Sequence, residues 1–231
     1  MVGNVHSAKT LEPGVGSLSL SVDGAGVMYS FSDSLQKADP EVFGEPQTFP
    51  TATLLPNLDF KMGVTDNVEI GVRLVEQLIG IEATVKYRYF HDGRNHLALA
   101  PYFQYYLLQN YSGGTHAIYT CELLDWLHLN MSVYGAYTYM DNINLFDLEV
   151  VPSKDFIAFG GIIGPQICGE SVFFTPAFEY SMLLPLQQGN IMHVQNFRGS
   201  LSFGWYIGRV KKQLNRMERK LDAINDKLDK N

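Results

Sequence analysis

Strict alternation of apolar and polar residues is the feature of this sequence that most constrains its fold. The segment from Ile81 to Tyr89 (IEATVKYRY) shows it most cleanly, and the pattern recurs from residue 15 to about residue 208. A period of two places successive side chains on opposite faces of a β-strand, so each segment has one apolar and one polar face. We count ten such segments: 17–23, 56–64, 67–74, 81–89, 96–107, 115–123, 127–139, 156–167, 172–182 and 195–207.

The lengths of these segments and of their connections favour a membrane barrel. Most segments have about 9–14 residues, against about 5–6 in soluble sheets and about 9–11 in a tilted transmembrane strand. Tight connections (65–67, 91–95, 124–126, 168–170) alternate with connections that include three long ones (32–50, 141–155, 183–194). Short turns at one end and longer loops at the other are typical of outer-membrane barrels. Because the strand number is even, we expect both chain ends on the short-turn side, the periplasm.

Composition excludes several other classes of protein. Aromatic residues make up 13% of the 231 residues, so the chain can bury a core and is not disordered. Two Cys cannot staple a disulfide scaffold, and a net charge of −7 argues against nucleic acid as a partner. No window approaches the ~18 apolar residues of a transmembrane helix. The mean hydropathy of −0.04 is expected when the two faces of each strand cancel.

The alternation also predicts which face of each strand contacts lipid and which face lines the lumen. The apolar positions, such as Val72, Val133 and Leu201, would touch lipid, whereas the polar positions would line the lumen. Aromatic residues near strand ends would form the interfacial girdles. The alternative is a large soluble antiparallel sandwich that buries the same apolar face as its core.

Charged residues on three consecutive predicted strands all fall on the polar face. In one interpretation they pair across strands and plug a narrow barrel, and in the other they line a water-filled path for a small solute. About eight strands are just filled by side chains, while about sixteen leave an aqueous channel, so ten strands favour the plugged interior. The cluster comprises Asp59, Lys61, Glu69, Arg73, Glu82, Lys86 and Arg88.

The C-terminal segment changes period. Its apolar residues are spaced four-three-four-three-four, which is a heptad stripe and predicts an amphipathic helix of about 20 residues within 209–231. The stripe needs a partner, which could be a second copy, a periplasmic protein, the inner leaflet of the membrane or the barrel mouth; the alternative is a solvated tail. Basic residues of the first turns suit lipid phosphates. The stripe is Val210, Leu214, Met217, Leu221, Ile224 and Leu228, and the basic residues are Arg209, Lys211, Lys212 and Arg216.

Three segments in the sequence resemble uncharacterised bacterial outer-membrane barrels, which are often lipoproteins. Residues 7–14 (SAKTLEPG) leading into 17–21 resemble the entry to the first strand, and 63–71 (GVTDNVEIG) resembles a periplasmic hairpin. Residues 87–90 with 95–101 resemble the next hairpin. The resemblance covers about residues 7–208 and implies a porin-like architecture in a Gram-negative outer membrane, without an activity. It would place a lipidated Cys before this region, but the sequence has none near Asn4.

Few residues suggest chemistry. Omptins, which are ten-stranded outer-membrane proteases, use Asp and His at the outer rim, and here His193 could meet Asp141, Asp147 or Asp155, although no omptin-like local motif is present. The His residues are scattered, Cys121 and Cys168 are isolated and too far apart for a disulfide, and no phosphate-binding loop follows a strand. We therefore expect no metal and no cofactor.

The sequence thus predicts an all-β protein, a ten-stranded antiparallel transmembrane up-and-down β-barrel with a periplasmic C-terminal α-helix. We expect an N-terminal periplasmic segment (1–14), the barrel (15–208) and the helix (209–231). The N-terminus has no apolar signal-peptide core, so the protein is either cytoplasmic or a mature chain with a starter Met, and the barrel pattern favours the second. The predicted function is that of a non-enzymatic scaffold in the bacterial outer membrane. Its expected partners are outer-membrane lipid and either a second copy or a periplasmic protein. The alternatives are a narrow channel and a surface hydrolase.

Overall fold

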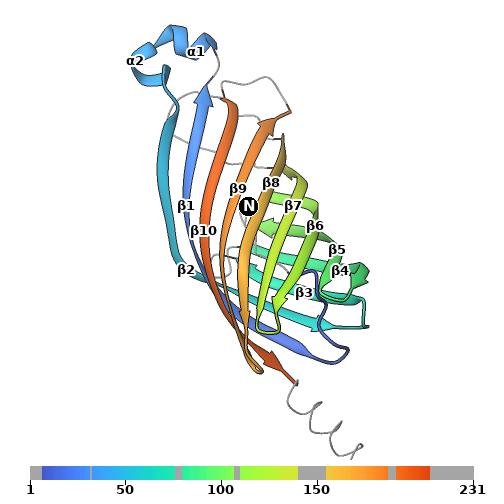
Figure 1. The fold of residues 1–231 in the computed structure, drawn as a ribbon. Coiled ribbons are helices and arrows are strands. Elements are labelled where there is room, and N and C mark those ends of the chain that lie inside the picture. Colours follow the sequence, from blue (N-terminus) through green and yellow to red (C-terminus); the bar gives the residue numbers. More distant parts are fainter. Residues whose placement is uncertain are drawn as a thin grey trace, which may run out of the picture.

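Ten antiparallel strands close into a single barrel in the computed structural model of the chain (Figure 1). The structure describes residues 7–31, 33–75, 80–106, 110–139, 155–186 and 191–208. Each strand pairs with its neighbours in sequence, and β1 closes the barrel against β10. The ten-stranded fold predicted from the alternation is therefore confirmed. The predicted helix 209–231 lies outside the described residues.

The strands and the two short helices of the described residues have the following bounds. The strands are β1 (Gly16–Phe31), β2 (Gln47–Gly63), β3 (Val68–Val75), β4 (Gly80–Asp92), β5 (Asn95–Tyr106), β6 (Asn110–Leu124), β7 (Leu127–Tyr139), β8 (Asp155–Cys168), β9 (Val172–Pro185) and β10 (Ile191–Ile207). The helices α1 (Asp33–Ala38) and α2 (Pro40–Phe43) lie between β1 and β2. We call the end with the four short turns the turn end and the opposite end the loop end.

The first long connection is shorter than the sequence predicts. The expected loop 32–50 shrinks because β2 begins at Gln47, and β1 continues beyond the predicted end at Asp23 to Phe31. The two extensions pair with each other, with Tyr29 opposite Gln47. Their alternation is weak because Gly24 and Gly26 interrupt the apolar face of β1. The pairing of the two strands, which no local pattern reveals, determines the observed boundaries.

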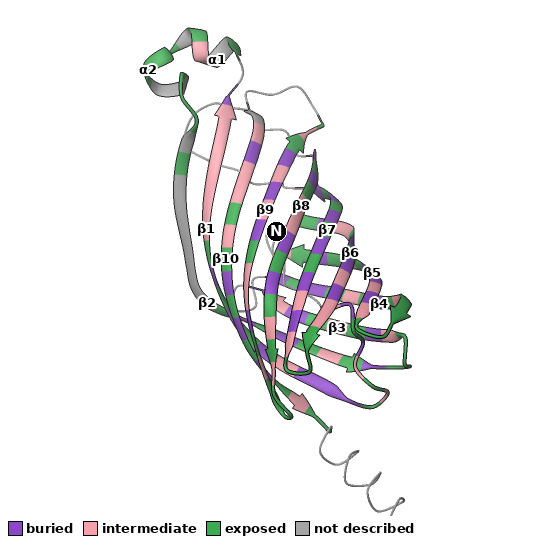
Figure 2. Cartoon of the chain, viewed as in Figure 1, coloured by how far each residue is buried: buried purple, intermediate pink, exposed green. Residues whose placement is uncertain are grey.

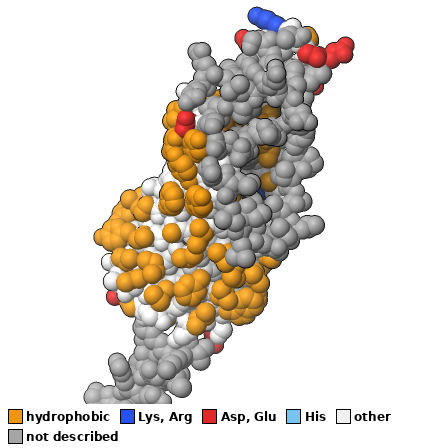
Figure 3. All heavy atoms as spheres, turned by 180° about the vertical axis from the view of Figure 1, so that it is seen from behind, with side chains coloured by type: hydrophobic (Ala, Val, Ile, Leu, Met, Phe, Trp, Pro, Cys, Tyr) orange, Lys and Arg blue, Asp and Glu red, His pale blue; other side chains and the backbone are white. Residues whose placement is uncertain are grey.

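The wall of the barrel is apolar outside and polar inside over most of its height. Along β7, buried and exposed residues alternate strictly from Asn130 to Thr138, and Figure 2 shows the same stripes on the neighbouring strands. Large hydrophobic side chains are exposed on all ten strands, and Val133 is 64% exposed. Figure 3 shows such side chains gathered mainly over the half of the barrel nearer the turn end. An apolar surface of this extent is what a membrane-spanning barrel presents to lipid.

The barrel rim is uneven. Strands β2 and β10 have 17 residues each, whereas β3 has 8, so one wall rises well above the other (Figure 1). The inner face of this tall wall is apolar. The sequence predicted a polar lumen, so this apolar part was not expected. Its buried cluster consists of Ala136, Phe156, Ala158, Leu183 and Val194. No helix among the described residues is long and apolar enough to cross a bilayer.

Candidate functional site

Arg73 occupies the centre of the lumen and is surrounded by carboxylates. Antiparallel pairing places Asp59 of β2 on one side of Arg73 and Glu82 of β4 on the other, and all three side chains are buried. The Nη2 atom of Arg73 lies 3.9 Å from Oδ2 of Asp23 on β1, and the same oxygen accepts a hydrogen bond from Asn57 at 2.8 Å. Arg73 is only 2% exposed, so charged side chains fill the lumen at this height.

A second layer of ion pairs lies closer to the turn end. The Nζ atom of Lys86 is 2.7 Å from Oε1 of Glu69, and both side chains are 4% exposed. The Nζ atom of Lys61 is 2.9 Å from Oδ2 of Asp59, which connects this layer to the Arg73 layer. Six of the seven residues of the charged cluster in the sequence thus lie together in the lumen.

Arg88 is the seventh residue of that cluster, and the structure places it apart from the other six. It lies beyond the end of β3, where its Nη2 atom donates hydrogen bonds to the backbone oxygen of Asp66 at 2.8 Å and to Oδ1 of Asn67 at 3.1 Å. The structure therefore does not bring Arg88 together with the other six residues, although the sequence grouped all seven. In the alternation of β4, Arg88 is an inward-facing position, like Glu82 and Lys86. It lies nearer the turn end than β3 reaches, so its side chain contacts the turn between β2 and β3 instead of a strand.

The far wall of the lumen also contributes to filling its middle. Tyr134 of β7 donates a hydrogen bond to Oε1 of Glu179 on β9 at 2.5 Å, and Nη1 of Arg198 on β10 is 4.0 Å from Oε2 of Glu179. The ring of His116 lies between the rings of Tyr102 and Tyr134, with centroids 5.0 Å from each. These contacts join side chains of β5 to β7 and of β7 to β10, so this wall fills its own side of the lumen.

The N-terminal segment enters the lumen at the turn end. Ala8 is fully buried, and its backbone N–H donates to Oγ1 of Thr120 on β6 at 2.7 Å. Lys86 donates to the backbone oxygens of Ser7 at 2.9 Å and Lys9 at 3.2 Å. The N–H of Leu11 donates to Oε2 of Glu69 at 3.0 Å. We call residues 7–12 the plug segment, because the ion pair of the second layer holds it inside the mouth.

The plug segment also contacts the wall formed by β5 and β6 through a charged side chain. Lys9 Nζ lies 2.8 Å from Oε1 of Glu122 on β6, and the same oxygen is 2.8 Å from Nε2 of His96 on β5. The sequence predicted a segment in the periplasm here and gave no sign of the plug, since residues 7–12 have no periodicity.

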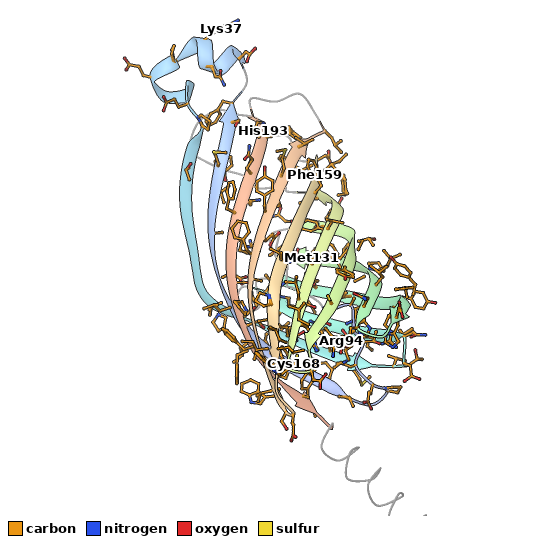
Figure 4. All side chains as sticks on the ribbon, viewed as in Figure 1. Lys37, Arg94, Met131, Phe159, Cys168 and His193 are labelled. Atoms are coloured by element: carbon orange, nitrogen blue, oxygen red, sulfur yellow. The ribbon has the colours of Figure 1, made fainter. Side chains whose placement is uncertain are left out.

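A cavity of about 410 Å³ lies beside the plug segment at the turn end. Its lining includes charged residues of the second layer, Lys86 and Glu69, and on the opposite side His128, Cys168 and residues of the turns. Figure 4 shows Cys168 near the turn end of the barrel. The volume of the cavity falls in the range typical of ligand pockets, which span about 300–1,000 Å³.

Cys168 is not isolated, contrary to the expectation from the sequence. Its Sγ atom lies 3.6 Å from Nδ1 of His128, and the hydroxyl of Tyr206 donates to it at 3.9 Å. Neither Cys168 nor Cys121 forms a disulfide. Pairing of β7 with β8 brings His128 and Cys168 together across 40 residues of sequence, so local spacing could not reveal the contact.

The hydrolase alternative receives no support from the described residues. His193 lies near the loop end (Figure 4), opposite Ser30 of β1. Asp155 of β8 accepts a hydrogen bond from Tyr137, and no hydrogen bond or ion pair in the described part of the chain joins it to His193. Asp141 and Asp147 lie outside the described residues.

Two further predictions concern a metal site and the C-terminal helix. Among the residues that the structure describes, no three His, Cys, Asp or Glu side chains form a group that could hold a metal ion. The helix residues Val210, Leu214, Met217, Leu221, Ile224 and Leu228 and the basic residues Arg209, Lys211, Lys212 and Arg216 lie outside the described ranges. Their partner-binding and lipid-binding roles stay predictions.

Comparison with known proteins finds distant structural likenesses and no family. No protein-family model and no curated protein sequence matches the chain. Among solved structures, an outer-membrane channel from Pseudomonas putida F1 is 9% identical, with 89% of this chain and 100% of that chain covered and a TM-score of 0.48. OprG from Pseudomonas aeruginosa (13%; 86% and 98% covered; TM-score 0.38) and Ail from Yersinia pestis (12%; 84% and 99% covered; TM-score 0.35) also match. At these identities the chain is similar to outer-membrane β-barrels in fold alone.

Proposed function

We propose that this protein is a closed outer-membrane β-barrel that serves as a non-enzymatic scaffold and presents its C-terminal helix to a partner in the periplasm. The observation that carries the proposal is the filled lumen, in which Arg73 is 2% exposed among buried carboxylates. A barrel that is closed in this way is suited to anchoring and display. The apolar outer belt supports its place in a membrane.

The end at which the last strand finishes supports a periplasmic position for the C-terminal helix. Strand β10 ends at Ile207, at the turn end, and Gly208 follows with a φ of 82°. This φ lies in the left-handed region that glycine adopts readily, so the chain can change direction on leaving the wall. Outer-membrane barrels place their short turns in the periplasm. The predicted helix 209–231 would therefore begin on the periplasmic side.

A narrow channel is the second function that the sequence suggested, and the geometry supports it less well. Two layers of ion pairs occupy the lumen along β1 to β4, and the plug segment is bonded to β4 and β6 at the mouth. Solute passage would require breaking buried charge pairs or expelling the plug segment, and a broken buried pair costs several kcal/mol. A steady conductance of the intact barrel in planar bilayers would favour the channel over the scaffold.

Deleting residues 209–231 should reduce the mass of the protein in detergent from an oligomer to a single barrel. The partner that this experiment detects is a second copy of the chain, whose heptad stripe would bury the apolar side chains, and removal of the helix eliminates that association. Light scattering coupled to size exclusion, corrected for bound detergent, measures the mass.

The matched variants keep the helix and change residues either inside or outside its heptad stripe. Replacing Leu214 and Leu221 together with Asp should reproduce the deletion, whereas Lys212→Gln outside the stripe should leave the mass unchanged. All variants should keep the heat-modifiable gel mobility of a folded barrel. An identical mass for the full chain and the deletion would contradict the proposed association.

A further inference from the structure

The cavity at the turn end brings a thiol, an imidazole and a phenol together. Cys168 is the last residue of β8, His128 is the second residue of β7, and Tyr206 lies on β10. All three line the cavity. The Sγ atom of Cys168 is 3.6 Å from Nδ1 of His128 and 3.9 Å from the hydroxyl of Tyr206. Three different strands of a rigid wall therefore position the groups around the sulfur.

This arrangement favours the reactive form of the cysteine. The thiolate is the nucleophile in thiol chemistry, and an imidazole beside the sulfur can accept the thiol proton. The Tyr206 hydroxyl donates toward the same sulfur, which stabilises negative charge that develops there. Cys121 offers an internal comparison, because it lies at the same end of the barrel but follows the buried, inward-facing Thr120 on β6. Its side chain therefore belongs to the outer face.

The charges around the cavity indicate which molecules would enter. Its lysines are neutralised, because Lys9, Lys61 and Lys86 lie 2.7–2.9 Å from Glu122, Asp59 and Glu69. Asp125 and Glu170 are exposed in the turns beside Cys168, and neither has an ion pair within the described ranges. These two carboxylates lie at the solvated rim of the cavity, where they would attract cations from solution. The volume of about 410 Å³ suits a small molecule better than a protein chain.

We propose that Cys168 is a reactive thiol that exchanges with small, positively charged disulfides entering the cavity. In this step Sγ of Cys168 attacks one sulfur of the disulfide, a new S–S bond forms, and the original S–S bond breaks. His128 receives the thiol proton and passes it to the leaving sulfur, which departs with the bonding electron pair. The disulfide is the oxidant, so the exchange requires no other co-reactant. It also requires neither the C-terminal helix nor a particular membrane orientation.

The test uses the full chain, folded in detergent, and two disulfides of similar size and opposite charge. Cystamine is cationic, and 3,3′-dithiodipropionate is anionic. Intact-mass spectrometry follows adduct formation at pH 7 in the parent chain, in Cys168→Ser and in Cys121→Ser. We expect cystamine to add one equivalent, at Cys168, and to react about tenfold faster than the anionic disulfide. Cys168→Ser should abolish this rapid addition, whereas Cys121→Ser should retain it.

Two further variants separate reactivity from structure. His128→Asn should slow addition at Cys168 about tenfold, since an ordinary thiol is only a few per cent ionised at pH 7. Asp125→Asn combined with Glu170→Gln should remove the preference for cystamine while the chain keeps its heat-modifiable mobility. Equal reaction rates of Cys121 and Cys168, or an unchanged rate in His128→Asn, would overturn the proposal.

Discussion

Replacing Arg73 with Met should lower the free energy of unfolding by about 3–5 kcal/mol, the usual cost of removing one partner from a buried ion pair. The guanidinium is 2% exposed and has Asp59 and Glu82 as its strand partners and Asp23 nearby. Without it, Asp23 and Glu82 would lose their buried positive neighbour, whereas Asp59 would keep its ion pair with Lys61. Urea titration of the folded barrel, followed by the fluorescence of its two Trp residues, measures the change.

Arg88→Met is the matched control for this prediction. Arg88 lies on the neighbouring strand β4 and bonds the turn between β2 and β3. Because its side chain is at the solvated rim, the loss should stay below about 1 kcal/mol. Adding Glu82→Gln to Arg73→Met should recover part of the lost stability by removing one of the stranded charges. If Arg73→Met costs no more than Arg88→Met, the central ion-pair layer does not support the barrel.

Placing an arginine on the outer wall should have the second-largest effect. Val133 lies near the middle of β7 and is 64% exposed. Val133→Arg should lower the free energy of unfolding in lipid vesicles by about 2–4 kcal/mol, because a charge near the bilayer midplane loses its hydration. Urea titration of vesicle-inserted protein measures the difference.

The control for Val133→Arg lies at the membrane boundary. Leu124→Arg, at the turn end of β6, should cost about 0–1 kcal/mol, since the penalty falls toward the interface. Val133→Leu should be close to neutral. A soluble sheet whose outer face meets water would tolerate arginine equally well at both positions, so equal effects at Val133 and Leu124 would argue against a lipid-facing wall.

The sequence predicts the wall of the barrel well because side-chain direction in a strand depends only on position. The alternation in β4 and β7 correctly places Glu82 and Lys86 inside and Val133 outside. Once neighbouring strands pair, their registers bring Arg73 between Asp59 and Glu82. The central layers of the lumen therefore follow from a one-dimensional pattern combined with antiparallel pairing.

The features that the sequence did not reveal depend on contacts between distant segments. The plug segment binds Thr120 across 112 residues and has no periodicity of its own. The contact between His128 and Cys168 arises only when β7 and β8 align. Arg88 has the correct inward phase, but the short β3 leaves it at the rim. In each case the deciding factor is the relative height of strands, which alternation does not encode.

Fractionation of cells that express the full chain behind an added secretory signal peptide tests the central claim, a closed barrel embedded in the outer membrane, most directly. The protein should be recovered with outer membranes and released only by detergent. Unboiled samples should migrate faster in a gel than boiled samples, because a closed barrel resists unfolding by the gel detergent until it is heated. Recovery in the soluble fraction without detergent, with the same mobility before and after boiling, would contradict the account.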